Sequence, residues 1–335
     1  MKNLVWILGT IVTLAAGPVR AQNGITLINV SYDPTRELYK EVDPAFSEFW
    51  KAKTGQTVTV DLSNGGSGSQ ARKVIEGNKA DVVTLGLAGD IDALHNKADL
   101  LPADWQSRLP DNSTPYTSTI VFLVRKGNPK AIKDWTDLIK PGVAIVTPNP
   151  KTSGGARWVY LAAYGYVLED KHGDTNAATR FVDKLYGNVK VFGAGARDST
   201  TSFTQNGIGD VLVNWENEAL LAANGTGRGQ YEIVYPSVSI LAEPPVSVVD
   251  KLVDQRGTRA VAEAYLKFLW TPAVQEMAAN HYFRPRLADV AERHAQTFPK
   301  IKTFTIQELF GGWAVAQKKH FDQGGIFDQI SESRR

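Results

Sequence analysis

Along most of the chain, short apolar runs alternate with segments in which apolar residues recur at helical spacing. Strands are predicted at residues 24–30, 57–62, 80–87, 119–127, 143–148, 189–193, 209–215 and 231–236. Helices are predicted from Pro34 onward, at 71–76, 134–139, from Gly155 onward, at 258–269, 272–279 and across most of the chain after Thr305. Short apolar strands that alternate with helices form parallel sheets buried on both faces. The pattern therefore predicts an α/β fold with parallel sheets.

The length of the chain and the absence of a linker predict two interleaved lobes. A chain of 335 residues is long enough for two domains, yet no stretch rich in Gly, Ser and Pro separates two halves. We therefore expect the chain to cross between lobes more than once, at the extended stretches 116–120 and 240–246. The predicted first lobe is 22–115 with 246–335, the second is 116–245, and a hinge joins them.

The first 21 residues have the pattern of a secretory signal peptide. Lys2 precedes an apolar run over residues 4–16, which ends at the helix-breaking pair Gly17-Pro18, and small residues stand one and three places before a cut after Ala21. A membrane anchor is the alternative, but this run is 13 residues long, whereas a membrane-spanning helix needs about 20. Cleavage after Ala21 and export to the periplasm are predicted.

Composition and charge remove several classes of function. Without the predicted signal peptide, the chain carries 35 basic and 35 acidic residues, so no basic surface for nucleic acid or anionic lipid is expected. The chain has no cysteine, which excludes thiolate catalysis, zinc–thiolate sites and iron–sulfur clusters. Its five histidines show no metal-binding spacing. We predict a protein that is not an enzyme and has no cofactor.

Four turns that precede predicted helices are candidate anion sites. They are Asp33-Pro34, Gly65 to Gly68 with Ser67, Ser153-Gly154-Gly155, and Gly193 to Ala196. The amides at a helix N-terminus have no internal partner and carry partial positive charge, so they bind anions. Simple capping or a flexible turn is the alternative at each. Arg157 and Arg197 flank two turns, where they either touch an anion or support the turns by pairing with carboxylates.

Several segments together carry a close resemblance to a known family. They are NVSYDPTRELY, GGSGSQ, PYTSTIVFLVRKGNP, NPKTSGGARW, GDVLVNWENEALL, ILAEPPVSVVDK, FRPRLADV and a C-terminal FGGW. With the signal peptide, they resemble the periplasmic sulfate-binding proteins of ABC importers in the sulfate/thiosulfate family, over nearly all of the mature chain. Ser69 departs from the pattern, since many relatives carry lysine there, but it lies outside the expected set of donors.

The resemblance implies a site and a function. The expected fold is a two-lobed type II periplasmic binding protein that holds dehydrated sulfate in the cleft between lobes. The implied donors are the amides of Asp33, Ser67, Gly154, Gly155 and Ala196, the hydroxyl of Ser67 or Ser153, and the indole of Trp215. From the residues alone, Trp215 reads as a core residue. The Asp33 carboxylate faces an anion in this scheme, so we expect it to cap its own helix.

The implied activity is capture of sulfate, closure about the hinge and delivery to the permease subunits of an ABC transporter, by a monomer. Preference for thiosulfate is the alternative within the family, and a molybdate or phosphate binder is a weaker one. A carrier of ligand to a chemoreceptor is compatible with the same pocket. A secreted hydrolase would need a nucleophile with a base or a metal site, and the sequence offers neither.

Overall fold

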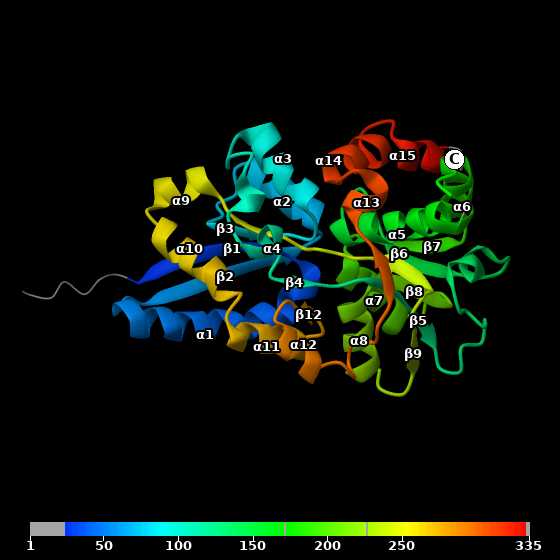
Figure 1. Cartoon of the computed structure of the whole chain (residues 1–335), viewed down its shortest axis with the longest axis horizontal. Coiled ribbons are helices and arrows are strands. Elements are labelled where there is room, and N and C mark those ends of the chain that lie inside the picture. The colour runs from blue at the N-terminus through cyan, green and yellow to red at the C-terminus, as the bar shows by residue number, and fades with distance from the viewer. Residues whose placement is uncertain (1–23, 171, 226, 333–335) are drawn as a thin grey trace, which may run out of the picture.

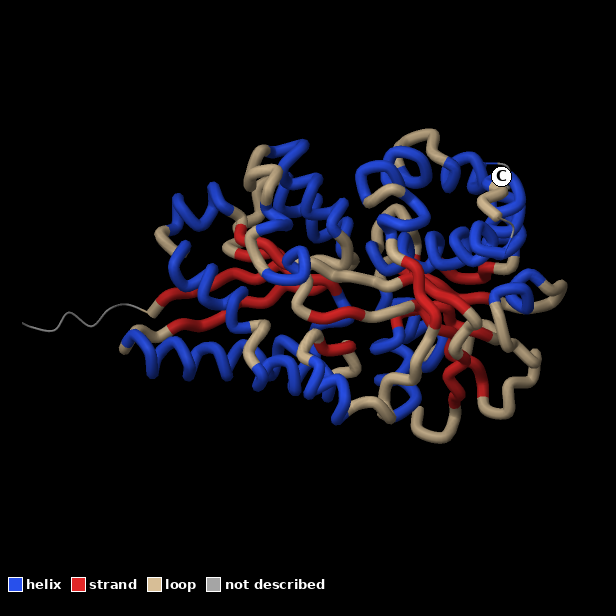
Figure 2. The backbone as a smooth tube through the Cα atoms, viewed as in Figure 1, coloured by secondary structure: helices blue, strands red, loops and turns tan. Residues whose placement is uncertain are grey.

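The computed structural model describes residues 24–332 apart from 171 and 226, so the predicted signal peptide lies outside the described residues. The chain forms two α/β lobes side by side (Figure 1), and Figure 2 shows a separate sheet in each lobe. The predicted α/β class is confirmed. Within the described part of the chain, no helix has both the length and the apolar character that crossing a membrane requires.

The sheet of the first lobe has the strand order β11-β3-β1-β2. Its strands are β1 (Ile25–Tyr32), β2 (Val58–Gly65), β3 (Val82–Thr84) and β11 (Val246–Val248). Its helices are α1 (Arg36–Thr54), α2 (Ser67–Ile75), α3 (Ala88–Ala98), α4 (Pro110–Ser113), α9 (Asp250–Arg256), α10 (Arg259–Phe268), α11 (Pro272–Asn280) and α12 (Ala288–Arg293). Helices α1 and α2 lie on opposite sides of this sheet (Figure 1). Leu38, Val42 and Phe46 form the buried stripe of α1, as their spacing predicts.

The sheet of the second lobe has the order β7-β6-β8-β5-β9. Its strands are β5 (Ile120–Arg125), β6 (Ile145–Pro148), β7 (Val189–Gly193), β8 (Val211–Trp215) and β9 (Tyr231–Val234). Its helices are the 3₁₀ helix η3 (Trp135–Ile139), α5 (Gly154–Asp170), α6 (Thr175–Gly187), α7 (Ala196–Thr204) and α8 (Glu216–Asn224). Helices α5 and α6 cover one face of the sheet, while α7 and α8 cover the other (Figure 1).

Neither sheet is wholly parallel, which corrects the expectation of parallel sheets. Strand β5 runs antiparallel to β8, with Ile120 opposite Trp215, and β11 runs antiparallel to β3, with Val246 opposite Thr84. Strands β5 and β11 each follow a crossover from the other lobe. The chain therefore enters each sheet beside the carboxyl ends of the parallel strands, so β5 and β11 run in the opposite direction to those strands.

The chain passes between the lobes three times, once more than the sequence predicts. The two predicted crossovers run side by side, because Ser118 and Ala242 exchange backbone hydrogen bonds of 2.9 Å in both directions. Short strands flank them, with β4 (Tyr116–Thr117) paired to β12 (Arg284–Pro285) and β10 (Val238–Ile240) to β13 (Lys302–Phe304). The third passage runs from α12 to β13. It carries no glycine-rich or extended apolar signature by which the sequence could have revealed it.

The C-terminal segment lies over α5 of the second lobe (Figure 1). It comprises α13 (Ile306–Phe310), α14 (Trp313–Ala316), a π-helical turn η4 (Gln317–Phe321) and α15 (Ile326–Glu332). Phe304 packs so closely on Gly165 that an added Cβ there would lie 2.2 Å from its ring. His320 bonds the Tyr160 hydroxyl at 3.1 Å, and burial lowers the pKa of His320 to about 3. Residues 302–332 thus pack with the second lobe, which differs from the predicted assignment of 246–335 to the first.

Candidate anion-binding site

The four predicted turns meet where the two lobes face each other. The space at three glycines shows how closely the turns approach, because a Cβ added at each would meet the facing turn. On Gly66 it would lie 2.6 Å from the Thr152 carbonyl oxygen, and on Gly195 it would lie 2.2 Å from an oxygen of Asp33. On Gly154 it would lie 3.0 Å from the Cβ of Ser67. At Gly66 the close atoms are backbone and cannot give way, so glycine is required there for the turns to meet, whereas at Gly195 the Asp33 carboxylate would have to move.

The indole of Trp215 completes the cluster. Trp215 ends β8 and is fully buried, and its Nε1–H has no hydrogen-bond partner among the described residues. A Cβ on Gly155 would lie 2.1 Å from that nitrogen, so the indole N–H lies against the first turn of α5. The first amides of a helix lack intrahelical partners, and a buried N–H without a partner is costly. Trp215 and α5 therefore present donors to one place, and the core interpretation of Trp215 is insufficient.

Only one of the two candidate hydroxyls is free to donate to a ligand. Ser67 Oγ donates its proton to Asp90 at 2.5 Å and accepts the Gly86 amide at 2.9 Å. A hydroxyl has one proton, so Ser67 can contribute its amide at the start of α2 but not its hydroxyl. Ser153 is buried immediately before α5, and its amide donates to Asn149 at 2.9 Å. The geometry favours the hydroxyl of Ser153.

Asp33 does not cap its helix, and this expectation is wrong. Tyr32 is the N-cap residue of the 3₁₀ helix η1 (Asp33–Thr35), and Asp33 is its first residue. Its carboxylate instead accepts a hydrogen bond from Arg36 at 3.4 Å and faces Gly195 of the other lobe. Burial raises the pKa of Asp33, and Glu218 adds to the rise while Arg36 and Arg197 oppose it.

Both flanking arginines pair with carboxylates across the lobe boundary. Arg157 contacts Asp90 at 2.9 Å. Arg197 contacts Glu37 at 2.7 Å and Glu218 at 2.9 Å. Of the two interpretations from the sequence, support of the turns by carboxylates is confirmed. Three carboxylates pair with the two arginines, so these side chains supply no net positive charge and the positive field at the cluster comes from helix N-termini.

Sequence reasoning missed two residues of this site. Asp90 lies in the first turn of α3 and holds both Ser67 and Arg157. Tyr32 has a buried hydroxyl without a partner among the described residues, and its ring centroid lies 5.5 Å from that of Trp215. Neither has a local signature, because each acquires its role from residues distant in the chain. The position of Tyr32 directly before the Asp33 turn is the one available hint.

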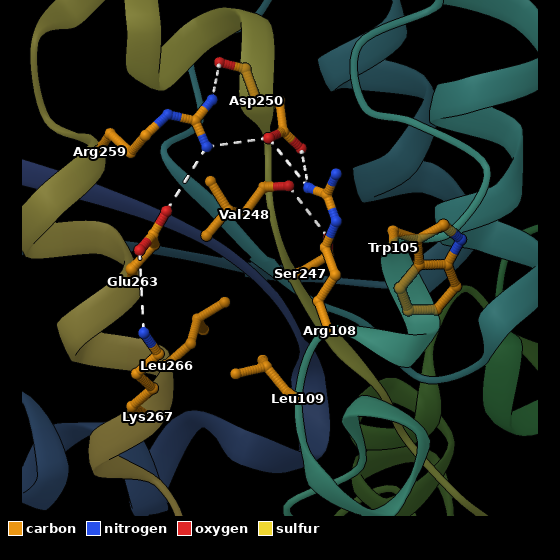
Figure 3. Close-up of a pocket in the computed structure, with 10 residues that line it drawn as sticks. All are labelled: Trp105, Arg108, Leu109, Ser247, Val248, Asp250, Arg259, Glu263, Leu266 and Lys267. Atoms are coloured by element: carbon orange, nitrogen blue, oxygen red, sulfur yellow. Dashed lines mark hydrogen bonds and ion pairs between the residues drawn. The ribbon is translucent and has the colours of Figure 1, made fainter.

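A separate pocket on the first lobe offers no comparable set of donors. It is a cavity of about 380 Å³ near α10, and Figure 3 shows its charged side chains turned toward one another. Arg108 and Arg259 both contact Asp250, at 3.0 and 2.9 Å. Elsewhere in the described residues, no cluster of three or more His, Asp or Glu side chains could hold a metal ion. The interlobe cluster is therefore the candidate site.

Comparisons with known proteins agree with this fold. Residues 29–284 match the family model described as bacterial extracellular solute-binding protein. A sulfate-binding protein of Escherichia coli is 60% identical over 327 residues, which cover 98% of this chain and 99% of that protein. A thiosulfate-binding protein of Pseudomonas aeruginosa is 56% identical over 304 residues, or 91% of each chain.

Solved structures extend the likeness to three dimensions. The sulfate-binding protein SubI of Mycobacterium tuberculosis is 33% identical, and the match covers 89% of this chain and all of that one with a TM-score of 0.80. A periplasmic thiamin binding protein shares the fold at a TM-score of 0.63 with 15% identity, over 86% of this chain and 93% of that one. The predicted two-lobed architecture of type II binding proteins is confirmed.

Proposed function

This chain belongs to the family of bacterial extracellular solute-binding proteins, and from that premise we propose that it captures sulfate between its lobes for an ABC importer. The observation that carries the proposal is the buried Trp215 indole N–H, which has no partner among the described residues and lies against the start of α5. An acceptor held between the lobes would satisfy this donor. The names of the sulfate-binding relatives support the identity of that acceptor.

The proposed donors suit a fully ionised tetrahedral anion. They are the amides of Asp33, Ser67, Gly154, Gly155 and Ala196, the hydroxyl of Ser153 and the indole of Trp215. Every oxygen of sulfate is an acceptor, and a buried dianion is stable only when it is fully hydrogen-bonded. Helices α2, α5 and α7 each direct an N-terminus to the site, and their dipoles spread the compensating charge.

Binding is proposed to be coupled to lobe closure. Asp33 and Ser67 belong to the first lobe, whereas Gly154, Gly155, Ala196 and Trp215 belong to the second, so only a closed form makes all contacts. We place the first lobe at 22–115 with 246 to about 301, and the second at 116–245 with the C-terminal segment. No bond is made or broken in this scheme, so the protein acts as a carrier rather than as an enzyme.

The signal peptide would be removed after Ala21, and the mature monomer would work in the periplasm with the permease subunits of the inner membrane. Intact mass of the exported protein tests the cleavage site, and light scattering tests the monomer.

Calorimetry on one ligand-free sample tests the function. Sulfate should bind, and phosphate should bind far more weakly or not at all, while molybdate, a larger tetrahedral dianion, tests the fit by size. Thiosulfate is the second candidate ligand, favoured by the relative of that name at 56% identity. Failure of both sulfate and thiosulfate to bind would overturn the proposal.

Phosphate is expected to be rejected by about 10⁴-fold or more, because hydrogen phosphate brings a proton to a site made of donors and leaves buried groups unpaired. Competition of phosphate against bound sulfate measures this ratio. Displacement at similar concentrations would indicate that a carboxylate at the site, such as that of Asp33, accepts the phosphate proton.

Sulfate affinity should be flat near neutral pH and rise toward acid pH. The pKa of Asp33 is raised, so its protonation removes a negative charge beside the anion before ordinary carboxylates titrate. By linkage, binding of the anion favours the protonated form of Asp33, and affinity therefore strengthens as pH falls. Titration of wild type and Asp33→Asn tests this, since the variant should lose the acid-side rise. A wild-type affinity that falls toward acid pH would contradict it.

A further inference from the structure

The side chain of Trp158 spans the boundary between the lobes. Trp158 lies one turn into α5 of the second lobe and is fully buried. Its indole Nε1–H donates to the carbonyl oxygen of Gly86 in the first lobe at 2.7 Å. Gly86 lies between β3 and α3. This hydrogen bond therefore exists only while the two lobes are together.

Gly86, whose carbonyl Trp158 holds, is also connected to the candidate site through its amide. The Gly86 amide donates to Ser67 Oγ at 2.9 Å, and Ser67 Oγ in turn donates to Asp90 at 2.5 Å. A continuous series of buried hydrogen bonds thus leads from the Trp158 indole to the first residue of α2. The amide of that residue, Ser67, is a proposed ligand donor, so the orientation of α2 depends on where Gly86 is held.

The FGGW motif near the C-terminus supports the Trp158 ring. Gly311 and Gly312 adopt φ angles of 70° and 94°, which glycine reaches without strain, and this tight turn directs Trp313 toward α5. The rings of Trp313 and Trp158 meet edge to face, with centroids 4.6 Å apart and planes at 87°. A Cβ on Gly89 of α3 would lie 3.8 Å from the Trp313 ring. Trp313 therefore also reaches the first lobe.

We propose that Trp158 and Trp313 act as positioning residues that hold the lobes closed and fix the Ser67 donor without touching the ligand. This inference rests on the proposed function for its ligand readout, but closure can be measured without ligand. In the closed form, Trp158→Phe leaves the Gly86 carbonyl buried without this donor. In an open form, water reaches the carbonyl. The cost therefore falls on the closed form alone.

The chain provides a matched control in Trp135. Its indole also is fully buried and donates to a backbone carbonyl, that of Val238, at 2.8 Å. Trp135 packs edge to face on Phe122 of β5, and Val238 begins β10, so both partners of this hydrogen bond belong to the second lobe as placed above. Trp135→Phe thus removes the same type of hydrogen bond without affecting the contact between lobes.

The first measurement is sulfate binding by calorimetry and stopped-flow. Trp158→Phe should weaken sulfate affinity about 10-fold, mainly through faster dissociation, because the closed complex is the form destabilised. Trp135→Phe should keep the wild-type affinity even if both variants melt at a lower temperature. Trp313→Leu should weaken affinity, and Trp313→Phe, which keeps an aromatic edge, should restore most of it. Equal affinities in Trp158→Phe and Trp135→Phe would overturn the inference.

The second measurement needs no ligand. Because the chain has no cysteine, Glu76→Cys and Lys190→Cys place one spin label on an exposed site of each lobe. Trp158→Phe should shift the distance distribution of the ligand-free protein toward longer, open distances relative to wild type and Trp135→Phe. Identical distance distributions in wild type, Trp158→Phe and Trp135→Phe would overturn the proposed role of Trp158 even if sulfate binds. If wild type binds neither sulfate nor thiosulfate, the proposed function fails, and this comparison still decides the role of Trp158.

Discussion

Gly155→Ala is expected to weaken sulfate binding by at least about 100-fold while the protein remains folded. The new Cβ would lie 2.1 Å from the indole nitrogen of Trp215, a distance at which one group must move. Movement of either one displaces a proposed donor, because the Gly155 amide and the Trp215 indole are both proposed to donate to the ligand. Overpacking and the loss of hydrogen bonds to a charged ligand act together. Calorimetry with sulfate measures the loss.

Gly165→Ala is the matched control for this substitution. Gly165 lies in the same helix, and its added Cβ would overlap the Phe304 ring to the same degree, at 2.2 Å. It should lower thermal stability by loosening the C-terminal segment, yet keep sulfate affinity within a few-fold of wild type if the C-terminal segment stays docked. Equal loss of affinity in both variants would show that overlap anywhere in α5 disables binding, and the assignment of Gly155 would then fail.

Trp215→Phe should weaken sulfate affinity roughly 10- to 150-fold, since a hydrogen bond to a charged group contributes about 1.5–3 kcal/mol. Phenylalanine keeps an aromatic ring against Tyr32 but has no N–H. Unchanged thermal stability with reduced affinity would separate the donor role from packing. Unchanged affinity would mean that the Trp215 indole donates to nothing in the complex.

The sequence predicted elements well where local pattern determines them. Leu38, Val42 and Phe46 recur at helical spacing, and α1 buries them. The direction of β5 and β11 was not predictable in this way, because an apolar run is the same read from either end. Direction depends on which lobe the preceding crossover leaves, and that is a property of the whole fold.

In the candidate site too, the features set by local sequence were predictable and those set by distant contacts were not. Its turns were predictable because glycine and serine before a helix have a local physical meaning, and the structure brings together Asp33, Ser67, Ser153, Gly154, Gly155, Ala196 and Trp215 at the lobe boundary. The roles of individual side chains were less predictable than the turns. The Ser67 hydroxyl is committed to Asp90, and Asp33 faces the other lobe instead of capping its helix. These partners come from distant parts of the chain, and one sequence carries no sign of them.

The position of β11 at the edge of the first sheet has a consequence for how the protein is made. Strand β11 pairs with β3, but nearly the whole of the second lobe lies between them in the chain. The first sheet therefore cannot be completed until synthesis has passed Val248, and pairing of such distant segments is slow. A nascent chain of this topology should stay unfolded long enough for threading through a membrane channel. A permuted chain that shortens the separation between β3 and β11 should fold faster and be exported less well.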